Sequence, residues 1–252
     1  MRHLAAELSW NRLEALARSG ACALLPVGST EAHGPHLPLS VDVVIAEEVC
    51  RRVSLRLERE AVQFPSVTYS LTDFAAPFPG TVTLSPEVAR SMLEQVVVGI
   101  ARAGFSVVAL VNHHLEPAHF RLVHEAAKRA AESSGVLVVV PDHRRAPLGP
   151  ALGEEFMHGG SHAGCYETSL MLAAAPGLVD EVVRALLPEV AVDLPQAIRA
   201  GARTFLDCGG TSAYFGAPGA ASAEEGHRLF ELIADATAAT IAEAGSPANA
   251  SR

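Results

Sequence analysis

The chain has 252 residues and a formal net charge of −9, and 49% of its residues are hydrophobic. A chain of this length can bury a sizeable core, and the composition is that of a globular protein. Phosphate-rich partners require a basic protein face, so the acidic balance predicts no nucleic-acid partner and no anionic membrane partner.

The cysteines and the N-terminal segment point to a particular cellular setting. The four cysteines are dispersed and form no CxxC pair, which predicts reduced thiols rather than disulfides or a cysteine zinc site. Residues 1–20 have the pattern of an amphipathic helix with Ser9 as its N-cap, and they lack the apolar core of a signal peptide. No apolar run is long and uncharged enough to span a bilayer. We therefore expect a soluble, cytoplasmic protein.

Apolar runs alternate with amphipathic stretches along the first 140 residues. Predicted buried strands lie at 21–27, 61–67, 105–111 and 136–140. The run at 105–111 is apolar on both faces, as in a central parallel strand. Predicted helices lie between the strands, at 42–58, 86–103 and 117–132. This alternation predicts an α/β fold with a parallel sheet and right-handed crossovers.

The helix expected at 86–103 has the clearest sequence signals. Ser85 is suited to the N-cap, and Pro86 to the first helical position. Its apolar residues recur at four-residue spacing and predict a buried stripe of Val88, Met92, Val96 and Ile100.

The second half of the chain is less regular. We expect helices at 164–175 and 221–244, and a glycine-centred loop at 205–215. The stretch 176–202 is compatible with either helix or strand. No repeat or linker divides the chain, so we expect a single domain over residues 1–252, with a short frayed tail at 245–252.

Two polar clusters follow apolar runs directly. Glu31, His33 and Asp42 lie in or just after the irregular loop that begins at Gly28, and His114 and Glu116 follow the central run. Because parallel strands bring their carboxyl ends to one edge of a sheet, we expect these side chains to meet. Two imidazoles and three carboxylates suit one or two divalent cations of the zinc or manganese type. Two such cations would lie roughly 3.5–4 Å apart and hold a hydroxide that attacks a carbonyl or phosphoryl centre.

Each of these residues also has an ordinary structural interpretation. Asp42 is well placed to cap the helix that follows, and Glu31 and His33 could be exposed turn residues. His114 could be a strand-end histidine that is bonded to a carbonyl group. His119 falls inside a predicted helix, where we expect it at the surface. The combination of two such loops at two strand ends favours the metal site.

Beyond these chemical arguments, the sequence resembles a known family. The loop at 28–38, with Asp42 after it, resembles the signature loop of the creatininase (creatinine amidohydrolase) family. Three later segments resemble the family's FPGT, N-G-H-x-E and HAG-x-x-ET-S motifs, in family order: 78–81, 112–116 and 161–169. The resemblance implies a three-layer α/β/α sandwich with a mostly parallel central sheet, and a hydrolase with two divalent metal ions per chain (Zn, Mn or Fe). It also implies a homo-oligomer, a hexamer in the family.

The resemblance also implies roles for individual residues. Glu31 and His114 would bind one metal, His33 and Glu116 the other, and Asp42 would bridge them. His162 would be the acid/base histidine, with Glu167 as a supporting carboxylate. The substrate pocket is assigned to His36, Phe78, His113, His158 and Tyr166. From chemistry alone, His162 in its glycine-rich loop suits protonation of a leaving nitrogen, although an ordinary loop histidine is the alternative.

Several positions depart from the family pattern. His113 replaces the family glycine, Pro117 replaces an asparagine, and Leu115 stands where creatininase has an aromatic residue. Trp10 is the single tryptophan and lies far from the site in sequence, so an aromatic lid is absent or replaced by Phe156 or Tyr166. Creatinine itself is therefore not the expected substrate. The basic pair at 144–145, in a predicted pocket loop, would suit a small anionic substrate.

The expected function is hydrolysis of a small molecule at an amide, formamide or cyclic amide C–N bond. Two alternatives stay open. One is a catalytically inactive, metal-stabilised binding or assembly protein on the same fold. The other is a family peptidase that trims a peptide-derived cofactor precursor. The presence of all five expected ligands favours an enzyme.

Overall fold

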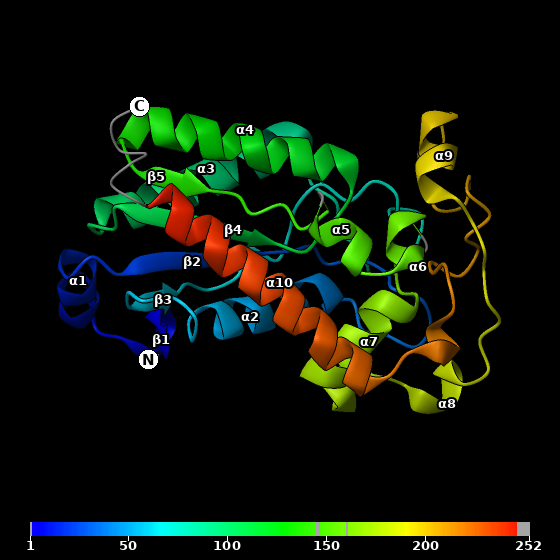
Figure 1. Ribbon diagram of the computed structural model, residues 1–252. Coiled ribbons are helices and arrows are strands. Elements are labelled where there is room, and N and C mark those ends of the chain that lie inside the picture. The colour runs from blue at the N-terminus through cyan, green and yellow to red at the C-terminus, as the bar shows by residue number, and fades with distance from the viewer. Residues whose placement is uncertain (1, 145–146, 160, 246–252) are drawn as a thin grey trace.

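The computed structural model describes residues 2–144, 147–159 and 161–245. Its centre is a five-stranded sheet in which every neighbouring pair is parallel, with the order β1-β3-β2-β4-β5 (Figure 1). The strands are β1 (Arg2–Leu4), β2 (Cys22–Val27), β3 (Ala61–Gln63), β4 (Val107–Asn112) and β5 (Leu137–Val139). The predicted parallel α/β fold is confirmed.

Helices cover both faces of the sheet, because side chains alternate along each strand. On β2, Cys22 and Leu24 pack into one core, and Ala23 and Leu25 into the other. The first core is covered by α2 (Val41–Val53), α7 (Cys165–Ala174) and α10 (Ala223–Ala244). The second is covered by α1 (Trp10–Arg18), α3 (Pro86–Arg102) and α4 (Pro117–Ser134). The result is the expected three-layer sandwich.

The stretch that was ambiguous between helix and strand contains short helices. Several of these short pieces gather beyond the carboxyl ends of the strands (Figure 1). In the ambiguous stretch the short helices are η2 (Pro176–Leu178), α8 (Glu181–Arg184) and α9 (Leu194–Arg199). The other short helices among the described residues are η1 (Ala5–Glu7), α5 (Leu148–Ala151), α6 (Glu154–Met157) and η3 (Pro218–Ala220). No described helix is long and apolar enough to cross a membrane.

Two expected helix boundaries need correction. The chain starts with strand β1, which pairs in parallel with β3, whereas the predicted helix is confirmed from residue 10, with Ser9 at its N-cap position. Backbone pairing with β3 stabilises the first residues as a strand, although their sequence has a helical pattern. Helix α2 ends at Val53, before the expected end at residue 58, and Ser40 rather than Asp42 lies at its N-cap position. The frayed tail expected at 245–252 lies outside the described residues except for Gly245.

Helix α3 begins as predicted but buries a neighbouring stripe. The Ser85 side chain accepts a hydrogen bond from the Val88 backbone N–H. The buried residues are Ala89, Leu93, Val97 and Ile100. Val88, expected in the core, is 56% exposed. Two apolar stripes lie one residue apart on this helix, and four-residue spacing cannot decide which of them faces the sheet.

The chain reverses direction across the sheet between β2 and β4. It leaves β2 through α2 and forms β3 on one side of it. It then returns through α3 and forms β4 on the other side. Helices α2 and α3 therefore cover opposite faces of the sheet, and a crevice opens at the carboxyl ends of β2 and β4, the usual ligand position in such sheets.

Candidate metal centre

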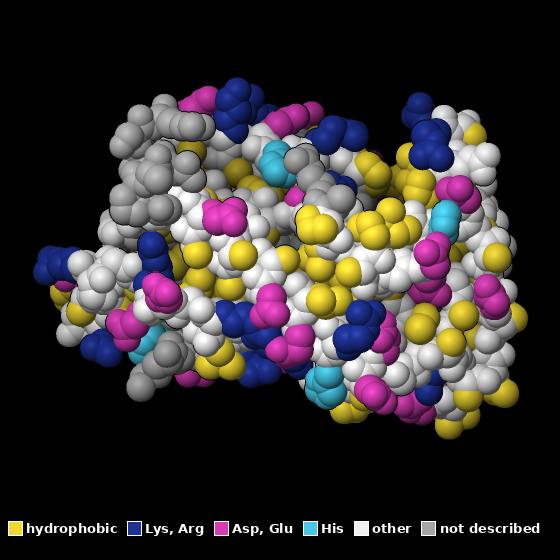
Figure 2. Space-filling model, in the orientation of Figure 1, with side chains coloured by type: hydrophobic (Ala, Val, Ile, Leu, Met, Phe, Trp, Pro, Cys, Tyr) yellow, Lys and Arg dark blue, Asp and Glu magenta, His cyan; other side chains and the backbone are white. Residues whose placement is uncertain are grey.

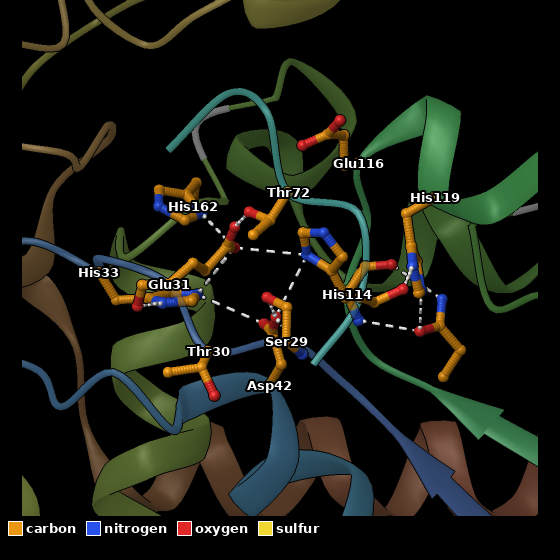
Figure 3. Close-up of polar contacts among 12 residues, drawn as sticks. Ser29, Thr30, Glu31, His33, Asp42, Thr72, His114, Glu116, His119 and His162 are labelled. Atoms are coloured by element: carbon orange, nitrogen blue, oxygen red, sulfur yellow. Dashed lines mark hydrogen bonds and ion pairs between the residues drawn. The ribbon is translucent and has the colours of Figure 1, made fainter. Parts of the chain in front are cut away.

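Polar side chains converge in this crevice. Val27 and Asn112 pair at the last register position of β2 and β4, so the loops that follow begin side by side. The residues brought together are Glu31 and His33 from the first loop, Asp42 from the first turn of α2, and His114 from the second loop (Figure 3). All four are at most 3% exposed. Buried charge of this density requires partners that neutralise it.

Asp42 lies between the two imidazoles. Its Oδ1 is 3.3 Å from His33 Nε2, and its Oδ2 is 3.2 Å from His114 Nδ1. The backbone N–H and the hydroxyl of Ser29 donate hydrogen bonds to Oδ2 and fix the carboxylate. Gly28 allows this approach, because a Cβ there would lie 2.8 Å from the Asp42 Cβ. Asp42 therefore presents one oxygen to each half of the cluster.

Hydrogen bonds on the far side of each ring assign its protons. His114 Nε2 lies 3.0 Å from the Leu71 carbonyl oxygen, and His33 Nδ1 lies 3.1 Å from that of Glu31. A carbonyl oxygen only accepts, so these nitrogens carry the hydrogens and the opposite nitrogens are free to bind a cation. His33 Nε2 is buried and has no hydrogen-bond partner among the described residues. An unpartnered imidazole nitrogen that faces carboxylates fits a metal ligand.

Glu167, in the first turn of α7, completes the second half. Its Oε2 is 3.5 Å from His33 Nε2 and accepts a hydrogen bond from the Ala163 backbone N–H. Three groups of side chains bring possible ligand atoms within 4.8 Å of one another. They are Glu31 with Asp42 and His114, His33 with Asp42 and Glu167, and Glu31 with His33 and His162. The first two groups fit two cations that share Asp42.

Glu116 lies elsewhere than expected. We expected it to share a cation with His33, but it belongs to none of the three groups among the described residues. Its carboxylate stands apart in Figure 3 and accepts a hydrogen bond from the Phe74 backbone N–H. Glu116 occupies the N-cap position of α4. Glu167, expected in a supporting role, is the carboxylate that groups with His33 and Asp42.

His162 lies beside the cluster as expected. Its Nε2 lies 2.9 Å from the Ala32 carbonyl oxygen, and its Nδ1 lies 3.8 Å from Glu31 Oε1. Its ring centroid is 4.3 Å from that of His33. Burial, with a contribution from His33, lowers the pKa of His162 to about 4. The imidazole is therefore neutral at pH 7, with Nδ1 available as a proton acceptor.

The buried carboxylates of the cluster favour positive charge beside them. Burial lowers the pKa of His33, but Asp42 and the other carboxylates outweigh it and raise that pKa to about 10. Burial raises the pKa of Glu167 to about 8 and that of Glu116 to about 7. Protons thus balance the carboxylates when no cation does, and a bound cation would displace them.

A short segment and a buried histidine hold one half of the centre. The Thr72 hydroxyl donates to Glu31, and the Leu71 carbonyl fixes the His114 ring. Ser70 Oγ lies 2.8 Å from His119 Nδ1. His119 Nε2 lies 2.9 Å from Asn112 Oδ1. The Asn112 side chain in turn donates to the His114 carbonyl oxygen and accepts from the His114 backbone N–H. His119, expected at the surface, is fully buried.

A cavity of about 390 Å³ opens onto the cluster, within the usual size range of ligand pockets. Its polar lining consists of Glu31, Asp42, His114, Glu116, Arg144, Ser161, His162 and Glu167. Much of the remaining lining is apolar and comes from α6, α9 and neighbouring loops. The cavity thus connects the candidate metal ligands with both candidate proton carriers, His162 and Glu116.

None of the five predicted substrate-binding residues is among the described residues that line this cavity. His36 Nε2 is bonded to the Thr168 hydroxyl, and His158 is on the surface beside Glu154. Phe78 packs against an apolar cluster that includes the cavity-lining Phe205, but it does not itself line the cavity. The His113 ring stacks on both His143 and Tyr166 in the interior.

Sequence reasoning missed much of the apolar lining. The residues not singled out are Phe74, Met157, Leu194, Pro195, Ile198 and Phe205. They lie in loops and in helices of four to six residues, where no periodic pattern forms. The one available signal was their unusual apolar character within polar, proline-rich stretches.

Comparisons with known proteins identify the family to which this chain belongs. The family model described as creatinine amidohydrolase matches residues 6–241. The chain belongs to the creatininase family. It is 33% identical over 190 residues to the creatinine amidohydrolase of Pseudomonas putida, covering 69% of this chain and 72% of the relative. It is 30% identical over 227 residues to the mycofactocin precursor peptide peptidase of Mycolicibacterium smegmatis, covering 86% and 83%.

Solved creatininase structures share the fold over nearly the whole chain. A creatininase crystal structure superposes with a TM-score of 0.79 at 27% identity, covering 97% of this chain and 98% of that one. The related structures include a manganese form and a variant of Zn-Zn type. This chain is therefore a member of a hydrolase family, and its described residues include groups that could hold metal ions.

Proposed function

We propose that this protein is a metal-dependent amidohydrolase with two divalent cations (Zn, Mn or Fe) per chain. Glu31, Asp42 and His114 would hold one cation, and His33, Asp42 and Glu167 the other. The observation that carries the proposal is the position of Asp42, whose two carboxylate oxygens face His33 and His114 separately. A shared carboxylate of this kind matches a two-metal hydrolytic site.

When bound, two divalent cations would polarise an amide carbonyl and lower the pKa of the attacking water. The residues of the chain provide the proton transfers. His162 Nδ1 lies beside Glu31 at the cavity wall, where it can accept a proton and return it to the leaving nitrogen. Glu116, with a pKa of about 7, is a second proton carrier on the same cavity. The expected reaction is hydrolysis of an amide, formamide or cyclic amide C–N bond.

A second candidate is hydrolysis of a peptide bond. Four mycobacterial relatives named mycofactocin precursor peptide peptidase are 29–30% identical over 84% or more of this chain. The same centre would serve either reaction, since both break an amide bond. Parallel assays with small amides and short peptides distinguish the two candidates.

The first test is metal content by elemental analysis after reconstitution with zinc or manganese. We expect about two equivalents per chain, and loss of both in Asp42→Asn because that side chain is shared. Asp235→Asn, an exposed residue paired with Arg56, is the matched control and should keep both equivalents. A wild-type protein that binds no metal would contradict the proposal and leave a binding protein on this fold.

A further inference from the structure

The cavity above the metal centre has an apolar side. Six large apolar or aromatic side chains contribute to it: Phe74, Phe156, Met157, Leu194, Ile198 and Phe205. Figure 2 shows a hollow in the surface between α4 and α9, with hydrophobic side chains along its edge. A small, wholly polar substrate would leave these walls in contact with water. They indicate that part of the substrate is apolar.

Arg144 is the one lysine or arginine among the described residues that line the cavity. Its Nε and Nη2 donate to the two Asp142 carboxylate oxygens at 2.9 and 3.2 Å. Its Cζ lies 3.3 Å from the centre of the Phe120 ring. These contacts hold the guanidinium in place before a ligand arrives, which reduces the entropy lost on binding. The side chain is 33% exposed and so accessible from the cavity.

The charges around the cavity favour an anionic group at Arg144. Two divalent cations more than balance the ligand carboxylates of Glu31, Asp42 and Glu167, so the loaded centre does not repel an anion. Asp142 offsets the formal charge of Arg144. Recognition of an anionic substrate group by Arg144 therefore depends on the guanidinium N–H groups that do not bind Asp142. A guanidinium offers several such donors in a plane, and a carboxylate is the group that this geometry recognises best.

We infer that the substrate combines three features: a scissile amide, an adjoining apolar group and a carboxylate that binds Arg144. An N-acylated apolar amino acid and the carboxyl end of a short peptide both have this chemistry. The inference rests on the proposed function, which it deepens by naming the substrate class. Arg144 is then a specificity residue, in contact with the substrate but not with the reacting atoms.

The test is calorimetric binding to the metal-loaded protein, which does not depend on turnover. The probes are N-acetylphenylalanine and N-acetylphenylalaninamide, which differ only in the carboxylate. Glycylglycylphenylalanine distinguishes a peptide source from a small acyl amino acid. The variants are Arg144→Gln and the double variant Asp142→Asn with Arg144→Gln, which avoids leaving an uncompensated carboxylate. Arg129→Gln, at an exposed position on α4, is the charge-matched control.

We expect both Arg144 variants to weaken binding of a carboxylate probe about tenfold, and binding of the amide less than twofold. Arg129→Gln should change neither. Equal weakening of both probes, or a carboxylate preference that survives in Arg144→Gln because the acid binds the metals, would overturn the inference. Failure of the proposed function can be distinguished from failure of this inference. It would appear as a protein that binds no metal, or as a protein that binds the probes normally but hydrolyses no amide.

Discussion

His119 belongs to none of the three candidate ligand groups, but it contacts the His114 ring and supports it through hydrogen bonds. It holds Asn112, which in turn holds the backbone of His114 on both sides. Removing such a support costs 10–100-fold in metal affinity in comparable sites. We expect His119→Phe to lower the affinity of the Glu31–Asp42–His114 group about tenfold, measured by cobalt(II) titration followed in the visible spectrum.

Two further variants separate positioning by His119 from simple packing. His119→Gln keeps one donor and one acceptor and should restore most of the cobalt(II) affinity and the native spectrum. His124→Phe changes an exposed histidine on the same helix and should leave both unchanged. A loss of affinity in His119→Gln but not in His119→Phe would show that ring packing against His114, not hydrogen bonding, is what matters.

The protonation of His33 and Glu167 predicts a pH effect on metal binding. Their pKa values of about 10 and about 8 both lie above 7, so both groups hold protons at pH 7 when no cation is bound. A metal needs the deprotonated forms. Burial lowers the pKa of His114, but Glu31 and Asp42 outweigh it and raise that pKa as well. We expect metal binding at pH 7 to release at least two protons and the metal affinity to fall as the pH is lowered. Calorimetry in buffers of different ionisation enthalpy measures this release, and no buffer dependence would contradict it.

At the scale of elements, α10 packs on α7 through a glycine. A Cβ at Gly226 would overlap the Ser169 carbonyl oxygen of α7, whereas one at Gly99 in α3 meets nothing within 4 Å. We expect Gly226→Ala to lower the free energy of unfolding by about 1–3 kcal/mol through overpacking. Gly99→Ala is the matched control and should raise it by roughly 0.5–1 kcal/mol through helix propensity. Urea denaturation of both variants measures the difference.

The elements that could be predicted are those with strong local signals. Strand β4 was recognisable because it is apolar up to its last residue, Asn112, and helix α4 because it lies between Pro117 and Gly135. The buried stripe of α3 could not be assigned, since two apolar stripes lie one residue apart. The residues at 176–202 form short helices whose positions depend on tertiary contacts, and no periodic pattern marks them.

The candidate site was predictable to a similar extent. Glu31, His33, Asp42 and His114 could be brought together because parallel strands end at one edge of a sheet. Their arrangement in two groups that share Asp42 was implied by the family resemblance, and the chemistry of the residues alone did not supply it. The choice between Glu116 and Glu167 depends on which way each side chain turns at the start of α4 and α7, and that is set by packing distant in sequence.

At the scale of the whole molecule, metal should stabilise the fold. The candidate ligands come from two loops, α2 and α7, so the site exists only in the folded chain. A ligand at about 1,000 times its Kd stabilises by about 4 kcal/mol, which raises the Tm by roughly 10 °C in a chain of this size. Adding EDTA should remove this increment. Asp42→Asn should show no response to EDTA, and a response there would place the stabilising metal elsewhere.

The expected homo-oligomer remains a prediction. The family resemblance implies a hexamer, and the 26.4 kDa chain mass sets the unit against which sedimentation equilibrium would be read. A mass of about six chains would support the resemblance, and a monomer at micromolar concentration would contradict it.

The dispersal of the candidate ligands along the chain has a consequence for biosynthesis. Translation produces Glu31, His33 and Asp42 early, His114 in mid-chain and Glu167 only when about two thirds of the chain has been made. Neither proposed cation group is complete before its last ligand has left the ribosome and α4 or α7 has docked. Metal binding is then a late event, and a chain that is truncated before His114 lacks a complete cation group.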